Sequence, residues 1–149
     1  MTDMQGDMRA GDEWGPLAPD FLARVEKALE SGGQKAVRAA TEEVAGEASA
    51  GYGIDGCSAP NFALTLAGLG RAMGFFAGAR DGGDRREQAA HRLTRAMATF
   101  PEMVAGEGRA CTNLMRAMGG KVAVKTGAEA VFVAILPEQK RAVALKVMD

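Results

Sequence analysis

The sequence has 149 residues, and its 18 Lys and Arg residues nearly balance its 19 Asp and Glu residues, so the net charge is -1 at pH 7. Apolar residues make up 47% and charged residues 25%, which is typical of one globular domain and excludes a disordered or fibrous chain. The balanced charge and the 5% aromatic content argue against a nucleic-acid partner. No apolar run approaches the roughly 20 residues that cross a bilayer, so we expect no membrane partner either. Residues 1–30 lack the basic start and apolar run of a secretion signal, so we expect a cytoplasmic protein with Cys57 and Cys111 as free thiols.

The chain is expected to begin with a leader and two short helices. Residues 1–18 mix Gly, Asp and Met without a period, as chain termini often do. Asp20 can cap a helix that ends at Gly32-Gly33, since apolar residues recur at helical spacing between them. A second helix is predicted from Gln34 to Ala45, and Gly46 stops it.

The next segment is rich in glycine and then becomes apolar. Residues 51–60 (GYGIDGCSAP) contain three glycines and a proline, which predicts a tight loop rather than a helix or strand. Pro60 is favourable as the first residue of a helix, and the sequence from there to Ala79 is apolar on nearly every side. We therefore predict a buried helix that needs other elements around it.

Two further helices follow. Asp84 and Glu87 have the spacing of a capping box, and the helix that they open is expected to end before Pro101. Its predicted apolar face consists of Ala90, Leu93, Met97 and Phe100, and its solvated face carries Arg85, Arg92 and Arg95. A short helix is predicted from Thr112 to Met118, where Gly119-Gly120 closes it.

The last part of the chain changes from a helical period to runs rich in β-branched residues. Three strands are predicted, at Lys121–Thr126, Ala130–Leu136 and Ala142–Met148. Residues 137–140 separate the last two strands, so these form an antiparallel hairpin. Helices followed by an antiparallel sheet predict an α+β fold.

Few catalytic arrangements are available to this composition. The serines are Ser31, Ser49 and Ser58, and His91 is the one histidine. No Gly-x-Ser-x-Gly occurs, and no serine has a lysine three positions later, the spacing that lets an amine deprotonate a hydroxyl on one helix face. There is no Cys-x-x-Cys and no pair of histidines for zinc. The sequence therefore contains no recognisable activated nucleophile.

Two segments nevertheless have the composition of a site. In Asp55-Gly56-Cys57-Ser58, free amides at the start of the predicted helix favour an anion and an ionised thiol, or else Asp55 or Ser58 merely caps the helix. In Lys125-Thr126-Gly127, at a strand end, glycine lets a ligand approach, lysine offers a charge to a carboxylate and threonine offers a hydroxyl. An ordinary turn is the alternative for both segments.

Taken together, four segments resemble the bacterial asparaginase II family in order and spacing: residues 51–63, 101–109, 125–132 and 144–146. Members of this family are thermolabile-type amidohydrolases with a serine β-lactamase-like, glutaminase-like fold. The resemblance covers residues 34–149 and corresponds to the later part of a typical member, which implies a partial fold of that kind. Residues 1–33, the leader and first helix, have no counterpart.

The resemblance implies a homologue of L-asparaginase, which hydrolyses the side-chain amide of L-asparagine to aspartate and ammonia. L-asparagine or a similar small amide would be the partner. Asp55 and Cys57 would line the amide site. The family requires no cofactor, but some intact members hold zinc. Cys57 would hold such a metal only together with an upstream cysteine. Lys125 would hold the substrate carboxylate at a sheet edge completed by Thr126 and Gly127, and Glu129 would contact the substrate amino group.

The family assigns its nucleophile to Ser-x-x-Lys and Cys-Ser-Gly-Lys-His segments that lie upstream of the glycine-rich loop, and the 149 residues contain neither. We therefore expect a truncated homologue that is inactive alone. The alternatives are a non-catalytic ligand-binding remnant, one half of a split enzyme, or a helical and sheet domain in which both segments are turns. Open strand edges and the apolar helix predict self-association or binding of a complementary N-terminal fragment.

Overall fold

The computed structural model describes residues 32–56 and 59–148 of the chain. Its elements are α2 (Gly32–Ala45), β1 (Tyr52–Ile54), β2 (Pro60–Phe62), α3 (Leu66–Gly78), α4 (Arg85–Thr99), α5 (Pro101–Ala105), α6 (Ala110–Ala117), β3 (Ala123–Thr126), β4 (Val131–Leu136) and β5 (Arg141–Lys146). Helices and antiparallel strands are combined, so the predicted α+β class is confirmed. The predicted leader, and the first helix up to residue 31, lie outside the described residues.

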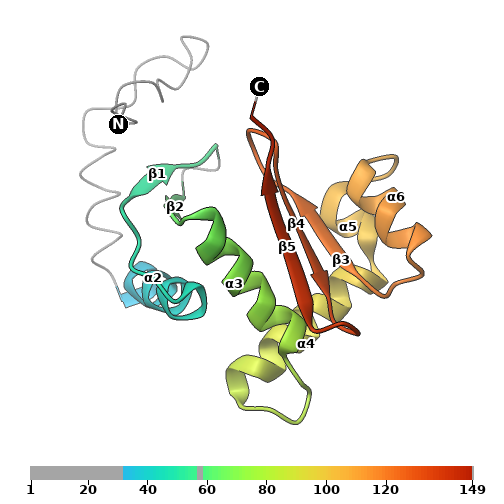
Figure 1. Ribbon diagram of the computed structural model, residues 1–149, viewed down its shortest axis with the longest axis horizontal. Helices are drawn as coiled ribbons and strands as arrows, with labels where there is room; N and C mark the ends of the chain where they lie inside the picture. Colours follow the sequence, from blue (N-terminus) through green and yellow to red (C-terminus); the bar gives the residue numbers. More distant parts are fainter. Residues whose placement is uncertain (1–31, 57–58, 149) are drawn as a thin grey trace.

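The main sheet has the strand order β3-β4-β5, and both pairs are antiparallel. Leu136 pairs with Arg141 across the turn of residues 137–140, which confirms the predicted hairpin. In Figure 1, α3 lies on one side of this sheet and α5 and α6 lie on the other. The sheet is thus covered on both faces by helices that precede it in the chain.

Two apolar clusters fix the sheet. On one face, Ala77 of α3 packs with Ala123 and Ile135, which oppose each other on β3 and β4. On the other face, Cys111 and Met115 of α6 pack against Val124 of β3. Burial of these side chains supplies most of the drive for packing helices on a sheet.

The capping box at the start of α4 is confirmed, because the Asp84 carboxylate accepts the Arg86 and Glu87 amides and the Glu87 carboxylate accepts the Asp84 amide. The predicted apolar face was wrong in part. Ala90 and Thr94 are buried, whereas Leu93 and Phe100, both expected inside, are 57% and 55% exposed. α4 thus buries its small residues Ala90 and Thr94 against the rest of the chain and leaves these two larger side chains at the surface. Arg85, Arg92 and Arg95 are exposed, as predicted.

The glycine-rich segment was predicted wrongly as a loop followed by a helix. Tyr52–Ile54 and Pro60–Phe62 form a two-stranded antiparallel ribbon, and Pro60 pairs with Ile54. A proline fits there because a two-stranded ribbon has two outer edges, where a missing N–H disturbs no ladder. The following helix begins only at Leu66, with Thr65 as its N-cap.

Two other boundaries also differ from the prediction. Gly32 and Gly33 lie in α2, so they do not end a helix as predicted. The apolar helix α3 buries Gly68, Ala72 and Ala77, but Leu66 at its start remains 46% exposed. Within the described residues, none of the helices is both long and apolar enough to cross a bilayer.

Candidate functional site

Lys125, Thr126 and Gly127 lie at the end of β3, which is an edge strand of the three-stranded sheet as described. Lys125 follows Ala123 on the sheet face that packs on α3, but it lies beyond the helical cover and is exposed. Its Nζ donates to the Thr126 carbonyl oxygen at 2.5 Å. The ammonium therefore folds over the open edge of the sheet rather than into the core.

The hydrogen-bond pattern of β3 decides which peptide groups reach this edge. Gly127 donates its N–H to Val131 of β4 at 2.8 Å. Because peptide groups alternate in direction along an antiparallel strand, those of Lys125 and Gly127 point toward β4 and the N–H and C=O of Thr126 point to the outer edge. The Thr126 N–H and the Lys125 ammonium thus share one edge, which is a suitable pair of donors for a carboxylate.

Thr126 and Gly127 also shape the edge. The Thr126 hydroxyl lies 3.3 Å from the Gly127 carbonyl oxygen and 3.4 Å from that of Val131, so its proton is donated within the turn. A Cβ on Gly127 would lie 3.4 Å from the Val131 Cβ, on the same sheet face as Lys125. Glycine therefore leaves open the space beside the ammonium.

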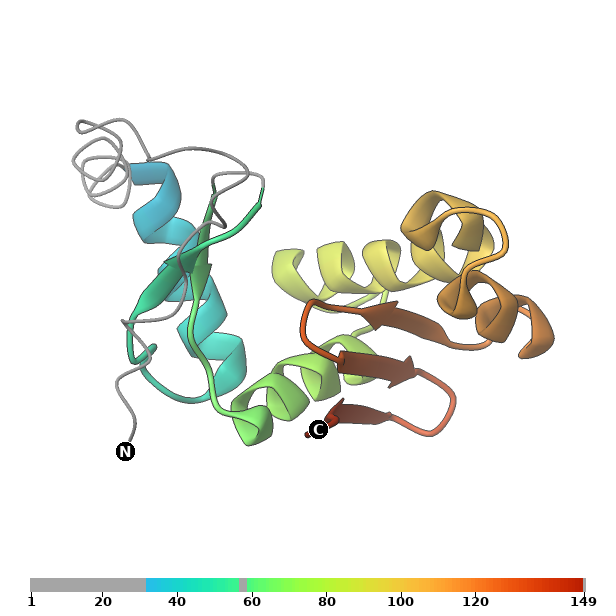
Figure 2. The same ribbon diagram turned by 90° about the horizontal axis from the view of Figure 1, so that it is seen from above.

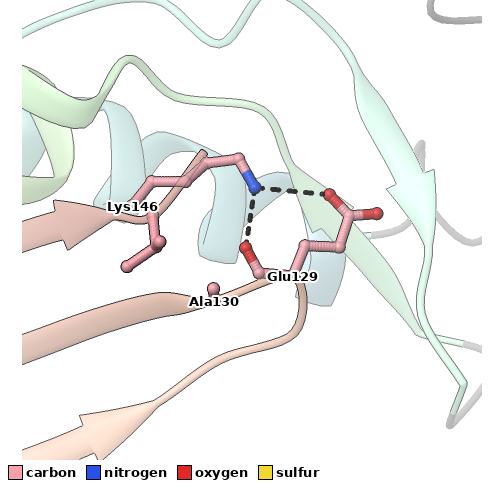
Figure 3. Close-up of a pocket in the computed structure, with 4 residues that line it drawn as sticks. Glu129, Ala130 and Lys146 are labelled. Carbon is pink, nitrogen blue, oxygen red and sulfur yellow. Dashed lines mark hydrogen bonds and ion pairs between the residues drawn. The ribbon is translucent and has the colours of Figure 1, made fainter. Parts of the chain in front are cut away.

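Glu129 lies in the turn between β3 and β4, and its carboxylate side chain is 79% exposed. Lys146 of β5 donates to the Glu129 carbonyl oxygen at 2.7 Å, and its Nζ is 3.6 Å from the carboxylate (Figure 3). Together with Ala130 and Val147, these residues line a cavity of about 450 Å³. The candidate edge is thus continuous with a turn that carries one exposed negative charge.

Asp55 lies at the end of β1 and is exposed. Its N–H donates to the Ala59 carbonyl oxygen at 3.0 Å, and its Oδ1 accepts the Gly56 amide at 2.8 Å. No helix starts within residues 59–62, so the helix N-terminus that was expected to attract an anion beside Asp55 is not there. Cys57 and Ser58 lie outside the described residues.

The predicted site residues therefore fall into two groups. Lys125, Thr126, Gly127 and Glu129 belong to one strand end and its turn, whereas Asp55 belongs to the ribbon, which packs with α2. Figures 1 and 2 show the ribbon and the three-stranded sheet on opposite sides of α3. Figure 1 also shows that the end of β1 and the β3–β4 turn point toward the same end of the molecule.

The carboxylates with perturbed pKa values hold the scaffold. The Thr65 backbone N–H, the Thr65 hydroxyl and the Arg71 guanidinium lower the pKa of Glu47 below its usual 4.5. The Ser49 N–H and Arg38 lower that of Glu42 in the same way. Glu42 ties α2 to the segment before the ribbon, and Glu47 ties that segment to Thr65 and Arg71 after the ribbon, so both acids position elements.

A second scaffold contact joins α5 to α6. The Arg116 guanidinium donates to Glu107 at 2.7 and 2.8 Å, which lowers the pKa of Glu107 and raises that of Arg116. It also lies 3.4 Å from Glu102 of α5. α5 and α6 pack on one face of β3, so the contacts of Arg116 with Glu107 and Glu102 help to hold the helices under the candidate edge.

The expected metal contact has no support in the described part of the chain. Within residues 32–56 and 59–148, no three His, Cys, Asp or Glu side chains gather as metal ligands do. Cys111 is a free thiol, but it is buried under β3 and 1% exposed. Cys57, the proposed ligand, lies outside the described residues.

Sequence reasoning missed the two residues that connect the elements. Glu47 binds Thr65, the N-cap of α3, and Lys146 binds Glu129, in each case across a long stretch of chain. A threonine three residues before Gly68 was a usable N-cap signal, but the neighbouring proline took precedence in our prediction. Nothing local in the sequence indicates either of the long-range partners.

The chain was compared with known proteins. No curated protein matches it. The sequence model of a family described as L-asparaginase II matches residues 28–149, which include the ribbon, all the helices and strands above, and the β3 edge with its Lys-Thr-Gly sequence. The chain therefore belongs to the L-asparaginase II family.

Proposed function

We propose that the outer edge of β3 is the carboxylate-binding part of a site that hydrolyses L-asparagine. The observation that carries this proposal is the shared edge of the Lys125 ammonium and the Thr126 N–H. A carboxylate held by an ammonium and a backbone amide receives charge-assisted hydrogen bonds, which are stronger than neutral ones. The family match supports a small amide as the substrate class.

Glu129 suits the other charge of the substrate. Asparagine carries an ammonium group on the same carbon as its carboxylate, so a negative side chain in the turn that follows the β3 edge gives complementary charge. The Glu129 carboxylate is exposed and follows Gly127 in the same turn. We assign it the substrate amino group, while Gly127 keeps the space beside Lys125 open.

The reaction needs a nucleophile in addition. In the proposed chemistry, an activated serine attacks the side-chain amide carbon, ammonia leaves with the proton that the serine gave up, and water releases aspartate from the acyl intermediate. Ser49, the one serine among the described residues, and His91 do not suit this task. The Ser49 hydroxyl bonds to the carbonyl oxygens of Gly51 and Ala63, and His91 Nδ1 lies 3.3 Å from the Ala79 carbonyl oxygen.

We propose that the nucleophile comes from a segment or chain that completes a serine β-lactamase-like fold. Such a body would contact both the ribbon and the β3 edge, because these point toward the same end of the molecule on either side of α3 (Figures 1 and 2). Asp55 and Cys57 would then line the amide end of the substrate, opposite Lys125. A metal would require Cys57 and a ligand from the added body.

A non-catalytic ligand-binding role is the second candidate. The observation that favours it is the sequence itself, which contains no Ser-x-x-Lys. A chain of this kind binds the amino acid at the β3 edge and releases it unchanged. The two candidates share one binding site and differ only in whether a complementary body supplies the nucleophile.

Ammonia release separates these candidates. The purified 149-residue chain is expected to hydrolyse L-asparagine no faster than buffer, because binding and oxyanion contacts alone leave only residual catalysis. Co-expression with an upstream family segment that carries Ser-x-x-Lys is expected to restore turnover. In that complex Lys125→Ala raises KM about tenfold or more, whereas Lys121→Ala, at the other end of the strand, leaves KM unchanged. Equal effects of the two changes would refute the assigned edge.

We also propose that the isolated chain associates with itself or with a complementary fragment. In the described structure, β5 pairs only with β4. Val143 and Leu145 on β5 are 46% and 41% exposed, and Val147 just after it is 59% exposed. An unpaired edge with an apolar face recruits other chains. Light scattering coupled to size exclusion is expected to show species heavier than 15.5 kDa at micromolar concentration. A dilution-insensitive monomer would refute this.

A further inference from the structure

The turn after the candidate edge has an unusual backbone. Glu129 and Ala130 have φ angles of 51° and 56°, and the Val131 N–H donates to the Ala128 carbonyl oxygen at 3.2 Å. Two successive positive φ angles in a turn normally call for Asn, Asp or Gly, because a Cβ crowds the carbonyl oxygen in the left-handed region. Glutamate and alanine therefore need support from outside the turn to hold this conformation.

The end of β5 provides that support. Lys146 Nζ donates to the Glu129 carbonyl oxygen at 2.7 Å, and the Val147 N–H donates to the Ala130 carbonyl oxygen at 3.2 Å. Both left-handed residues are thus bonded through their carbonyl groups, as the Lys146 contact in Figure 3 shows for Glu129. The second Lys146 contact, to the Glu129 carboxylate at 3.6 Å, joins an exposed side chain and is the weaker of the two.

We propose that Lys146 is a positioning residue for the β3 edge. Lys146 holds the left-handed turn through its bond to the Glu129 carbonyl oxygen. The turn then holds Gly127, whose N–H donates to the Val131 carbonyl oxygen. The outward peptide group of Thr126 and the Lys125 ammonium are thereby held in place. This inference rests on the proposed function of the β3 edge, and it gives Lys146 a role without any contact to the ligand.

The alternative is that the Lys146 ammonium binds the ligand directly, and a glycine substitution separates the two. If Lys146 acts through the turn, Ala130→Gly replaces its effect, since glycine adopts positive φ without the Cβ penalty. If Lys146 contacts the ligand, glycine at position 130 restores nothing. Lys146→Arg keeps a donor to the Glu129 carbonyl oxygen and serves as the conservative variant.

The experiment is a titration of the ¹⁵N-labelled full chain with L-aspartate, followed by amide chemical shifts. Lys146→Met is expected to weaken binding about tenfold, which corresponds to a competent turn population reduced to about a tenth. Lys146→Arg and the double variant Lys146→Met/Ala130→Gly recover most of the affinity. Lys121→Met is the control, since Lys121 is an exposed lysine 3.6 Å from Glu138 at the far end of β3.

The same spectra report the turn independently of binding. The HN–Hα couplings of residues 129 and 130 are expected to change in Lys146→Met and to return in the double variant. If the wild-type chain binds no L-aspartate, the proposed function fails, while these couplings still decide the role of Lys146. Unchanged couplings and affinity in Lys146→Met, or a double variant as weak as Lys146→Met, would overturn the inference.

Discussion

The β1–β2 ribbon and the β3–β4 turn are both chain reversals that the sequence marks as possible sites, yet different parts of the molecule hold them. The Ser49 hydroxyl donates to the carbonyl oxygens of Gly51 and Ala63 on either side of the ribbon, and the Ser49 backbone bonds to Glu42 and Arg38 of α2. The β3–β4 turn is fixed by its own sheet, through Lys146. Because β4 and β5 hold the end of β3, its hydrogen-bond donors stay in place for a ligand. We therefore propose that the substrate binds at the β3 edge rather than at the ribbon.

The two regions depend on different buried residues, and the largest expected effect is on the sheet side. Met115 is 0% exposed and packs against Val124 beneath the β3 edge. Met115→Ala is expected to lower the free energy of unfolding by about 2–5 kcal/mol. Met118, at the end of the same helix, is 49% exposed and serves as the control. Met118→Ala is expected to change the free energy of unfolding by less than about 0.5 kcal/mol. Urea unfolding followed by circular dichroism measures both, and equal effects would contradict this packing.

The ribbon side has its own weak point at Gly68. A Cβ there would fall on the Glu47 carboxylate, which Thr65 and Arg71 hold in place, whereas a Cβ at Gly74 meets nothing within 4 Å. Gly68→Ala is expected to destabilise the chain by about 1–3 kcal/mol. Gly74→Ala, in the same helix, stabilises it by about 0.5–1 kcal/mol because alanine favours the helix. The reverse order in thermal unfolding would refute the Glu47 contact.

A smaller effect is expected on the stability of the chain at acidic pH. The folded pKa of Glu47 is lowered from 4.5, so the stability it contributes is fully present above pH 4.5 and is lost as the pH falls through the lowered value. Glu47→Gln is therefore expected to be less stable than the wild type at pH 7, and the difference between the two narrows below pH 4.5. Thermal melts across this range test it. A difference independent of pH would show that the charge of Glu47 is not involved.

The sequence predicted those elements whose signals are local. Alternating β-branched residues predicted the β4–β5 hairpin, and the Asp84–Glu87 spacing predicted the start of α4. The ribbon was missed because its strands have three residues each and are too short to show a period. The start of α3 was missed because Pro60 was taken as its first residue, although Thr65 offers a local N-cap for Gly68.

The candidate site divides in the same way. The Lys-Thr-Gly sequence was predicted at a strand end and, through the family resemblance alone, at a sheet edge; the structure has Lys125 and Gly127 exposed at the end of the edge strand β3. The sequence did not indicate which peptide groups of β3 face outward, because that depends on the pairing of Gly127 with Val131. Neither did it indicate Lys146, whose contact with Glu129 exists only because β5 pairs with β4.

A map of L-aspartate binding on the ¹⁵N-labelled chain tests directly whether the β3 edge binds the substrate. The ligand carries the same carboxylate and ammonium groups as asparagine and needs no nucleophile. We expect amide shifts to change at residues 125–131 and to stay unchanged at residues 52–56, 61 and 62 of the ribbon. Lys125→Ala is expected to abolish the change, while Lys121→Ala preserves it. Changes confined to the ribbon, or none at all, would contradict the assignment of substrate binding to the β3 edge.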